Sequence, residues 1–170
     1  IEMLFDSLLK GNSLGAVICI AEEKGNRPLF ASRRFTIDGN NVSSVDEDKL
    51  SANQWFVIDG QQRLQTFYIG LKGTLHGKKL YFDLMSDYQA DEYDFKFASS
   101  KEALPTVNKD RTEMAPTECL WIPVSELFAE LSETGDAYEV GEQLADEDEL
   151  DIGTSQRRQL EYNVKKFDTA

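Results

Sequence analysis

Histidine and cysteine are scarce in this chain, and each scarcity removes a class of chemistry. The one histidine, His76, lies in the Gly-flanked segment GTLHGKK, where an exposed loop position is expected. Cys19 and Cys119 lie within apolar runs without a partner at metal-ligand spacing, so we expect buried, reduced thiols. Nucleophilic triads and zinc sites require clustered His or Cys side chains. The sequence therefore disfavours a nucleophilic hydrolase and a zinc protein.

Long apolar runs are also missing. No run approaches the roughly 20 residues that cross a bilayer, and the opening IEMLFDSLLK has neither a basic lead nor a small-residue cleavage site. We therefore expect a cytoplasmic protein with no membrane partner. With 170 residues, of which 41% are apolar, the chain can fill the core of a single domain over residues 1–170. Helical spacing continues to both ends without a cap or a stop, which predicts a fragment of a longer protein.

Positive charge is in deficit, because 18 Lys and Arg residues face 31 Asp and Glu residues, giving a formal net charge of −13. This balance argues against a general nucleic-acid binder, since neutralising phosphates requires a basic surface. Much of the acid falls within residues 133–154, which we interpret as an acidic loop or a solvated helix face. A site for a hard cation is the alternative, but the Gly-punctuated pattern of a calcium loop is absent from the sequence there.

Helices and strands alternate in the first half of the sequence. We expect a helix over residues 1–10 ended by Gly11, a buried strand over 16–22, a strand over 54–58 and a helix over 61–72 closed by Gly73. On the second helix, one face carries Leu64, Phe67, Tyr68 and Leu71. Residues 23–52 are polar and rich in Gly, Asn, Ser and Asp, and we interpret them as an insertion or hairpin loop whose extended piece is RPLFASRRFTI.

Strands cluster in the middle of the sequence. We expect strands over residues 78–84, 93–97 and 119–123, a helix over 124–131 and a final helix over 157–170 with Leu160, Val164 and Phe167 on its apolar side. The fold class that follows is mixed α/β or α+β.

A strand, a tight turn and a helix meet in the segment VIDGQQRLQT. Gly60 permits a turn geometry that is closed to other residues. The helix that follows presents unpaired N–H groups and the positive end of its dipole, which together favour an anion. Arg63 lies in the first turn, where it could clamp a phosphate bidentately, while Gln61 and Gln62 add neutral donors and acceptors. Thr66, one turn further on, could also touch a phosphate.

Asp59 precedes the turn and could hold a metal, a water or a ribose hydroxyl. A simpler interpretation is open for each charged residue of this junction. Asp59 could cap the helix, Gly60 could only make the turn, and Arg63 could pair with a surface acid. The residues themselves leave both interpretations standing.

The stretch VIDGQQRLQTFYIGLKG resembles the Asp-Gly-Gln-Gln-Arg signature of the family named after the N-terminal domain of the GmrSD modification-dependent restriction endonucleases. Further likenesses follow in the family's order over most of residues 1–131, in LFDSLLKGNSLGAVICI, LYFDL and LWIPVSELF. The layout also resembles the ParB and sulfiredoxin superfamily, a small mixed sheet flanked by helices. In that superfamily a Gly-x-x-Arg loop binds nucleotide phosphates, and Gly60 and Arg63 occupy its two places.

The resemblance implies a nucleotide-binding, NTP-hydrolysing domain of a modification-dependent DNA restriction or phage-defence system. The segment Asp59–Arg63 is then expected to hold the phosphates, with Asp59 and Arg63 in catalytic roles and Mg²⁺ at Asp59. The implied partners are DNA through the full-length protein and an HNH-type nuclease domain or subunit, and a homo-oligomer is a further expectation. Two alternatives remain: a non-catalytic DNA- or protein-binding module, and a ParB-like nuclease domain.

Aromatic and basic residues also meet outside the signature. Arg33, Arg34 and Phe35 form a cluster that could touch nucleic acid or a nucleotide, although an exposed charge pair on a hairpin is the simpler interpretation. Trp55 and Trp121 fall within strand-like runs, where core positions are expected rather than base-stacking platforms.

Overall fold

A computed structural model describes residues 1–29, 31–37, 44–45, 48–108, 117–146 and 152–170 of the chain. The class is mixed α+β, as the sequence predicts. The elements divide into two compact units, Leu14–Gly77 in one and Ile1–Ser13 with Lys78–Ala170 in the other. The strand pairings within residues 14–77 are local to that segment, and the single domain over residues 1–170 stays a prediction.

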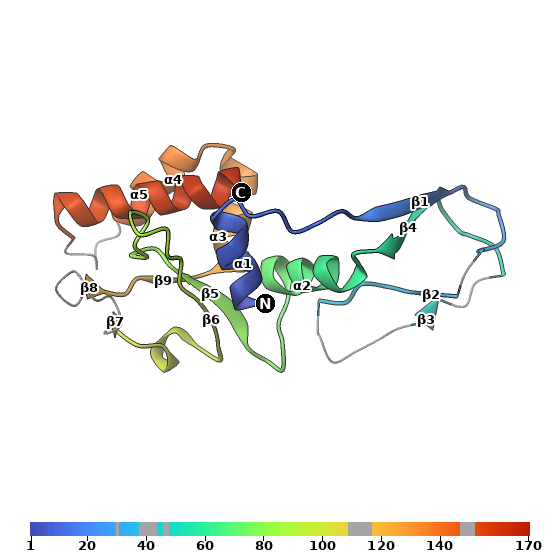
Figure 1. Cartoon of the computed structure of the whole chain (residues 1–170), viewed down its shortest axis with the longest axis horizontal. Coiled ribbons are helices and arrows are strands. Elements are labelled where there is room, and N and C mark those ends of the chain that lie inside the picture. Colours follow the sequence, from blue (N-terminus) through green and yellow to red (C-terminus); the bar gives the residue numbers. More distant parts are fainter. Residues whose placement is uncertain (30, 38–43, 46–47, 109–116, 147–151) are drawn as a thin grey trace. The chain divides into compact units, whose positions relative to one another are not determined.

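The unit of residues 14–77 is built on an antiparallel pair of strands, β1 (Ile18–Glu22) and β4 (Gln54–Asp59), and the helix α2 (Gln61–Lys72) follows at once (Figure 1). Both strands and the helix lie close to their predicted bounds. The prediction of a buried strand is wrong for β1, because Ile18 and Ile20 are exposed. β1 pairs with one strand in a two-stranded sheet, and a short apolar run does not reveal how many layers cover it.

The predicted insertion over residues 23–52 contains the short strands β2 (Ser32–Arg33) and β3 (Ser44–Val45), which pair antiparallel. Its extended piece is fastened to α2 by a side-chain amide. The Gln65 amide accepts from the Thr36 N–H at 3.1 Å and donates to the Thr36 carbonyl at 2.6 Å, as a neighbouring strand would. The N–H of Thr74 donates to the carbonyl of Ile37, and a Cβ on Gly73 would lie 1.9 Å from that oxygen. These hydrogen bonds therefore hold the end of the extended piece beside α2.

The second unit is built on a sheet of order β6–β5–β9, made of β6 (Phe95–Ala98), β5 (Lys79–Asp83) and β9 (Trp121–Pro123). A smaller ladder joins β7 (Val107–Asn108) to β8 (Thr117–Glu118), and a 3-10 turn η1 covers Lys101–Ala103. In the described part of this unit the helices are α1 (Glu2–Leu9), α3 (Val124–Thr134), α4 (Ala137–Ala145) and α5 (Thr154–Thr169). Figure 1 shows α4 and α5 running side by side.

The core of this second unit forms where helices cover the sheet. The rings of Phe82 and Phe95 stack with centroids 4.6 Å apart, and Phe5 of α1 packs on Phe95 at 5.5 Å. On α5, Leu160 and Val164 are fully buried, as the sequence predicts for the apolar side of the final helix. Each such side chain contributes roughly 1.5–3 kcal/mol by leaving water, so this core is the stable part of the unit.

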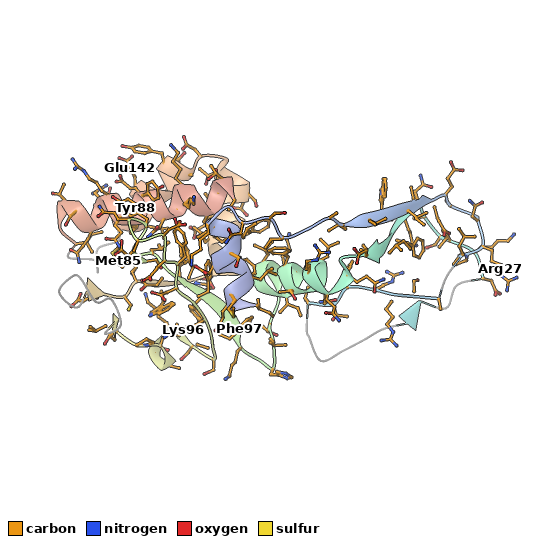
Figure 2. The ribbon with its side chains drawn as sticks, viewed as in Figure 1. Arg27, Met85, Tyr88, Lys96, Phe97 and Glu142 are labelled. Carbon is orange, nitrogen blue, oxygen red and sulfur yellow. The ribbon has the colours of Figure 1, made fainter. Side chains whose placement is uncertain are left out.

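A buried polar turn joins β5 to α5. Oδ1 of the fully buried Asp83 accepts from the N–H groups of Met85 and Leu120, at 2.9 and 2.8 Å. From α5, the buried amide of Asn163 donates to the carbonyls of Leu84 and Ser86. Figure 2 shows Met85 and Tyr88 near α5, where the Tyr88 ring stacks on Tyr162 with centroids 4.2 Å apart.

Of the two interpretations of the acidic segment, residues 133–154, its first part has the helix rather than the loop. The helix α3 extends to Thr134, and α4 occupies Ala137–Ala145. The carboxylate of Asp136 caps α4 by accepting from the N–H groups of Tyr138 and Glu139. Apolar positions at helical spacing explain the helix, since Val140 and Leu144 are buried. Residues 147–151 lie outside the described part of the chain.

Candidate functional site

The junction between β4 and α2 has the backbone geometry that the sequence predicts. Gly60 is the N-cap of α2 with φ +84°, in the left-handed region that favours glycine. No side chain among the described residues caps the helix at this point. The first N–H groups of α2 are therefore left for solvent or for an anion, which the helix dipole also favours.

Arg63 holds a backbone segment. Its guanidinium donates from Nη1 to the carbonyl of Leu14 and from Nη2 to the carbonyl of Ala16, the latter at 2.8 Å. The same group lies 3.8 Å from Oδ2 of Asp59, an ion pair that is weak because 65% of the Asp59 side chain is exposed. Arg63 thus fixes residues 14–16, which lead into β1, against the start of α2.

Two glycines make this approach of Arg63 possible. Gly15 has φ +83°, and a Cβ at this position would lie 2.5 Å from Nη1 of Arg63. A Cβ on Gly60 would lie 3.0 Å from Val17 and 3.4 Å from Nη2 of Arg63. The role of Gly15 was not predicted, although the turn GNSLG before the first strand carries the signal. The requirement for glycine at this position becomes visible only when its contact with Arg63 in the folded chain is known.

A cleft of about 1070 Å³ opens beside the junction, between the wall of residues 31–36 and the surface of β4 and α2. Gln61, Gln62 and Thr66 line it, whereas Asp59, Gly60 and Arg63 are not among its lining residues. The predicted phosphate site therefore divides into a cleft-facing set and a set that builds the junction. Gln61 also donates from Nε2 to the carbonyl of Val57 at 2.7 Å, which fixes its amide.

The charge of this cleft differs from that of the chain. Arg33 and Arg34 are its charged residues, and none of the described residues that line it is acidic. In a chain of net charge −13, such a lining attracts anions locally. The basic-aromatic cluster of the insertion is thus part of a concave site rather than only an exposed charge pair.

The prediction that Trp55 lies in the core is wrong. Trp55 is 74% exposed and lines the cleft, as does Phe35, which is 39% exposed. Trp121 is a core residue as predicted, with 5% of its surface exposed and its Nε1 donating to the carbonyl of Pro105. Both tryptophans lie on strands, but β4 belongs to the two-stranded sheet and β9 to the sheet covered by helices.

Metal-binding groups are not clustered in the described part of the chain, where no set of three or more His, Cys, Asp and Glu side chains could hold an ion. Mg²⁺ at Asp59 stays a prediction. His76 is exposed, as expected, and Cys19 and Cys119 are not joined by a disulfide. The expected burial of Cys19 is wrong, because this residue shares the exposure of β1.

Together, the fold and the site define a class: a mixed α+β protein in which a glycine turn leads from a strand into a helix beside an arginine-lined cleft. The family model described as GmrSD restriction endonuclease, N-terminal domain, matches residues 1–167. The chain belongs to this family, which places it among components of restriction endonuclease systems and confirms the resemblance drawn from the signature. A search of curated proteins gives no match to the chain. None of the helices in the described ranges is long and apolar enough to span a membrane.

Proposed function

We propose that this chain is the nucleotide-binding, NTP-hydrolysing domain of a modification-dependent DNA restriction or phage-defence system. The observation that carries the proposal is the uncapped start of α2 at Gly60, which adjoins a cleft lined by two arginines and, among its described lining residues, by no acid. Backbone N–H groups at a helix start and nearby guanidinium groups are the donors that triphosphates use in proteins. Family membership supports the restriction system itself.

Each residue of the signature receives a separate role in this proposal. The N–H groups of Gln61 and Gln62 face the phosphates, and Thr66 adds a hydroxyl one turn further on. Arg63 acts as a positioning residue, because its guanidinium already holds the carbonyls of Leu14 and Ala16. Its positive charge still raises the local potential at the helix start.

Asp59 is the residue that fits a magnesium ion. Mg²⁺ commonly binds through one or two carboxylates, the phosphates of its nucleotide and retained waters, so a single exposed carboxylate is sufficient. When bound, the ion would neutralise charge that develops during phosphoryl transfer. Asp59 would orient the ion, and its distance of 3.8 Å from Arg63 leaves its oxygens accessible.

The proposed partners follow from the family. DNA would be engaged through the full-length protein, and an HNH-type nuclease domain or subunit would cut it. Self-association into a homo-oligomer would bring several nucleotide sites together. We also expect the domain to act in the cytoplasm, where nucleoside triphosphate, Mg²⁺ and invading DNA are present.

A second candidate function is a non-catalytic module that holds a nucleotide or a nucleic-acid phosphate as a structural ligand. The engagement of Arg63 with backbone carbonyls favours it, because a guanidinium committed to the protein is not free to stabilise a transition state. The two candidates predict the same binding but differ in turnover.

The test compares binding and turnover in Gln62→Glu and wild type. A glutamate in the first turn favours the helix but repels a triphosphate, so nucleotide affinity should fall about tenfold or more while the melting temperature holds or rises. Gln89→Glu, an exposed loop change of equal charge in the other unit, serves as the control. Calorimetric titration with each nucleoside triphosphate and Mg²⁺ measures binding, and phosphate release measures turnover.

Three results are informative. Binding with phosphate release that Asp59→Asn abolishes supports the enzyme. Binding without release in the full-length protein supports the second candidate. Equal affinity of Gln62→Glu and Gln89→Glu would place the nucleotide elsewhere and overturn the proposal.

A further inference from the structure

The two units carry very different charges. Residues 14–77 contain seven Lys and Arg and seven Asp and Glu, so this unit is neutral. The remaining residues hold eleven basic and twenty-four acidic side chains and therefore the whole net charge of −13. The cleft lies entirely within the neutral unit. The total charge of the chain thus gives no reason to exclude a polyanion from this cleft.

Away from the start of α2, the residues that line the cleft include both cationic and aromatic side chains. Arg33, Arg34 and Phe35 come from the insertion, and Trp55 comes from β4. Trp55 has 74% of its surface exposed, which is costly for an indole unless something covers it. Because Gln65 fixes the Thr36 backbone through two hydrogen bonds, the insertion residues are held beside α2.

We propose that Arg33, Arg34, Phe35 and Trp55 form a subsite for an unpaired nucleobase and its phosphate. The base stacks on the exposed indole of Trp55, and the guanidinium groups of Arg33 and Arg34 bind the phosphate next to it. The subsite deepens the proposed nucleotide site and rests on it for the idea that a nucleotide enters this cleft. The base-binding wall itself uses residues that the α2 phosphate site does not.

The chemistry of the wall selects this ligand. An aromatic face beside basic groups is the combination that binds unpaired nucleic acid, since every base offers a π-face and every nucleotide a phosphate. A base inside a duplex is stacked on its neighbours and cannot reach the indole. The lining amide of Gln54 provides donors and an acceptor for a base edge. A free nucleotide and a single strand share this chemistry, and the experiment separates them.

Tryptophan fluorescence provides a direct test because the chain has two tryptophans and Trp121 is buried. The probes are a nucleoside monophosphate, a nucleoside triphosphate, an eight-nucleotide single strand, its duplex and inorganic tripolyphosphate. We expect the first three to quench Trp55, whereas the duplex and tripolyphosphate leave its emission unchanged. In Trp55→Phe this quenching disappears, because Trp121 alone remains.

Affinity is then measured by calorimetry with the same probes. Trp55→Ala should weaken the binding of nucleotide or single strand roughly tenfold or more and leave tripolyphosphate binding unchanged. Arg33→Ala with Arg34→Ala should weaken the binding of the two nucleotides and of the single strand and reduce the salt dependence of binding. Tyr68→Ala removes another exposed aromatic of the same unit that does not line the cleft, and it should bind as wild type does.

The different probes show whether a negative result contradicts this inference or the proposed function. Tight monophosphate binding with a weak single strand identifies a free nucleotide, and the reverse identifies a nucleic-acid strand. If wild type does not bind tripolyphosphate, the α2 phosphate site is contradicted, whereas the inferred base subsite is not. The inference is overturned if Trp55→Ala binds the nucleotides and the single strand as tightly as wild type does.

Discussion

Gly15, Gly60 and Arg63 depend on one another although almost fifty residues separate the first from the last. Arg63 holds the carbonyls of Leu14 and Ala16, and both glycines lie where any larger residue would press on the Arg63 guanidinium or on Val17. The signature thus encodes, through Gly60 and Arg63, contacts that hold residues 14–16 beside the proposed anion site. A substitution at one of these positions should therefore alter the stability cost of a substitution at either of the other two.

Gly60→Ala should destabilise the protein more than Gly25→Ala does. Both glycines have positive φ, +84° and +87°, so each substitution pays the left-handed penalty of about 1 kcal/mol. At Gly60 the new Cβ also meets Val17 at 3.0 Å, whereas nothing described lies within 4 Å of a Cβ at Gly25. We expect total costs of about 2–3 and 1 kcal/mol in urea unfolding, and equal costs would show that crowding at Gly60 is relieved.

Asn163→Leu should cost about 2–4 kcal/mol of unfolding free energy. The change keeps a similar volume but removes both donors to the buried carbonyls of Leu84 and Ser86. Gln159→Leu is the matched control, because its amide donates to Met85 and Ser86 from a half-buried position where water can replace it. We expect a cost of about 1 kcal/mol for the control, and similar costs for both variants would contradict the argument from burial.

Tyr93 should make stability fall in alkali. Burial, with the nearby Asp91 carboxylate, raises the pKa of Tyr93 to about 12. An unfolded tyrosine ionises near pH 10, so the unfolded chain loses its proton first as pH rises. The contribution is therefore complete below pH 10 and is lost between pH 10 and 12, amounting to about 2–3 kcal/mol.

Urea unfolding of wild type and Tyr93→Phe, measured from pH 8 to 12, checks this dependence. Subtracting the free energies of unfolding of the two proteins removes the contribution of the other tyrosines. The free energy of unfolding of wild type should fall relative to that of the variant as pH rises above 10. Parallel curves over the whole range would mean that the Tyr93 phenol is not held out of water.

At the scale of elements, helices and strands with regular patterns were predictable. The bounds of α2 follow from Gly60 and Gly73. For α5 the apolar side with Leu160 and Val164 is confirmed, but the helix begins at Thr154 rather than at residue 157. The burial of single strands was not predictable. Trp55 and Trp121 occupy similar apolar runs, yet Trp55 lies in a two-stranded ladder, whereas Trp121 lies in a three-stranded sheet and packs in a cluster with Tyr81, Ala98 and Leu104. The pattern within a strand specifies its faces but not the layers that cover them.

The candidate site was predictable only in part. A glycine turn before a helix is a local feature, so φ at Gly60 and the helix start followed from the sequence. The partners of Arg63 and the cleft required the pairing of segments that are far apart, 14–16 with 63 and 31–36 with 65. Alternation and spacing carry no information on such pairings. The apolar face predicted for α2 also differs, since Ile69 and Gly70 are its buried residues.

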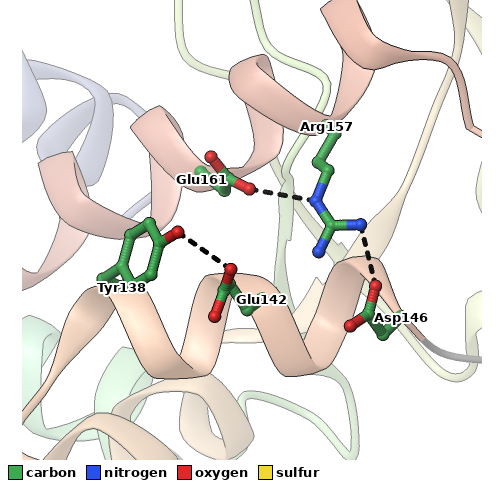
Figure 3. Close-up of polar contacts among 5 residues, drawn as sticks. All are labelled: Tyr138, Glu142, Asp146, Arg157 and Glu161. Carbon is green, nitrogen blue, oxygen red and sulfur yellow. Dashed lines mark hydrogen bonds and ion pairs between the residues drawn. The ribbon is translucent and has the colours of Figure 1, made fainter.

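The packing of α4 on α5 should respond to salt. Arg157 donates to Asp146 at 2.8 Å and to Glu161 at 3.2 Å, and Tyr138 donates to Glu142 (Figure 3). The hydrogen bond to Asp146 raises the pKa of Arg157 above its usual range, and the bond to Glu142 raises the pKa of Tyr138. Tyr138 and Asp146 are exposed and the other three groups are only half-buried, so solvent and salt screen their charges.

Arg157→Ala should therefore lower the melting temperature by only about 1–3 °C at low salt and by less at 1 M salt. Arg158→Ala, at an exposed neighbour on the same helix, is the control for the change in helix propensity and for the lost charge. Calorimetric melts of the three proteins at both salt concentrations provide the comparison. A loss that stays constant in 1 M salt would assign the effect to packing of the arginine stem.

At the scale of the whole molecule, the separation of charge limits what the chain does alone. The unit outside residues 14–77 carries the entire net charge of −13 and repels the backbone of duplex DNA. We expect the pure 170-residue chain with Mg²⁺ to leave supercoiled plasmid uncut on agarose gels. Nicking that Asp59→Ala abolishes would instead assign a nuclease activity to this domain.

The position of α1 has a consequence for synthesis on the ribosome. Glu2 of α1 accepts from the N–H of Phe97, and Phe5 packs on Phe95. An eight-residue helix is too short to persist without such contacts. At roughly 5–20 residues per second, about 5–20 s pass before its partner strand is made. Residues 14–77, whose strand pairs are internal, can fold during that delay, so α1 should become ordered after a segment that is translated later than it.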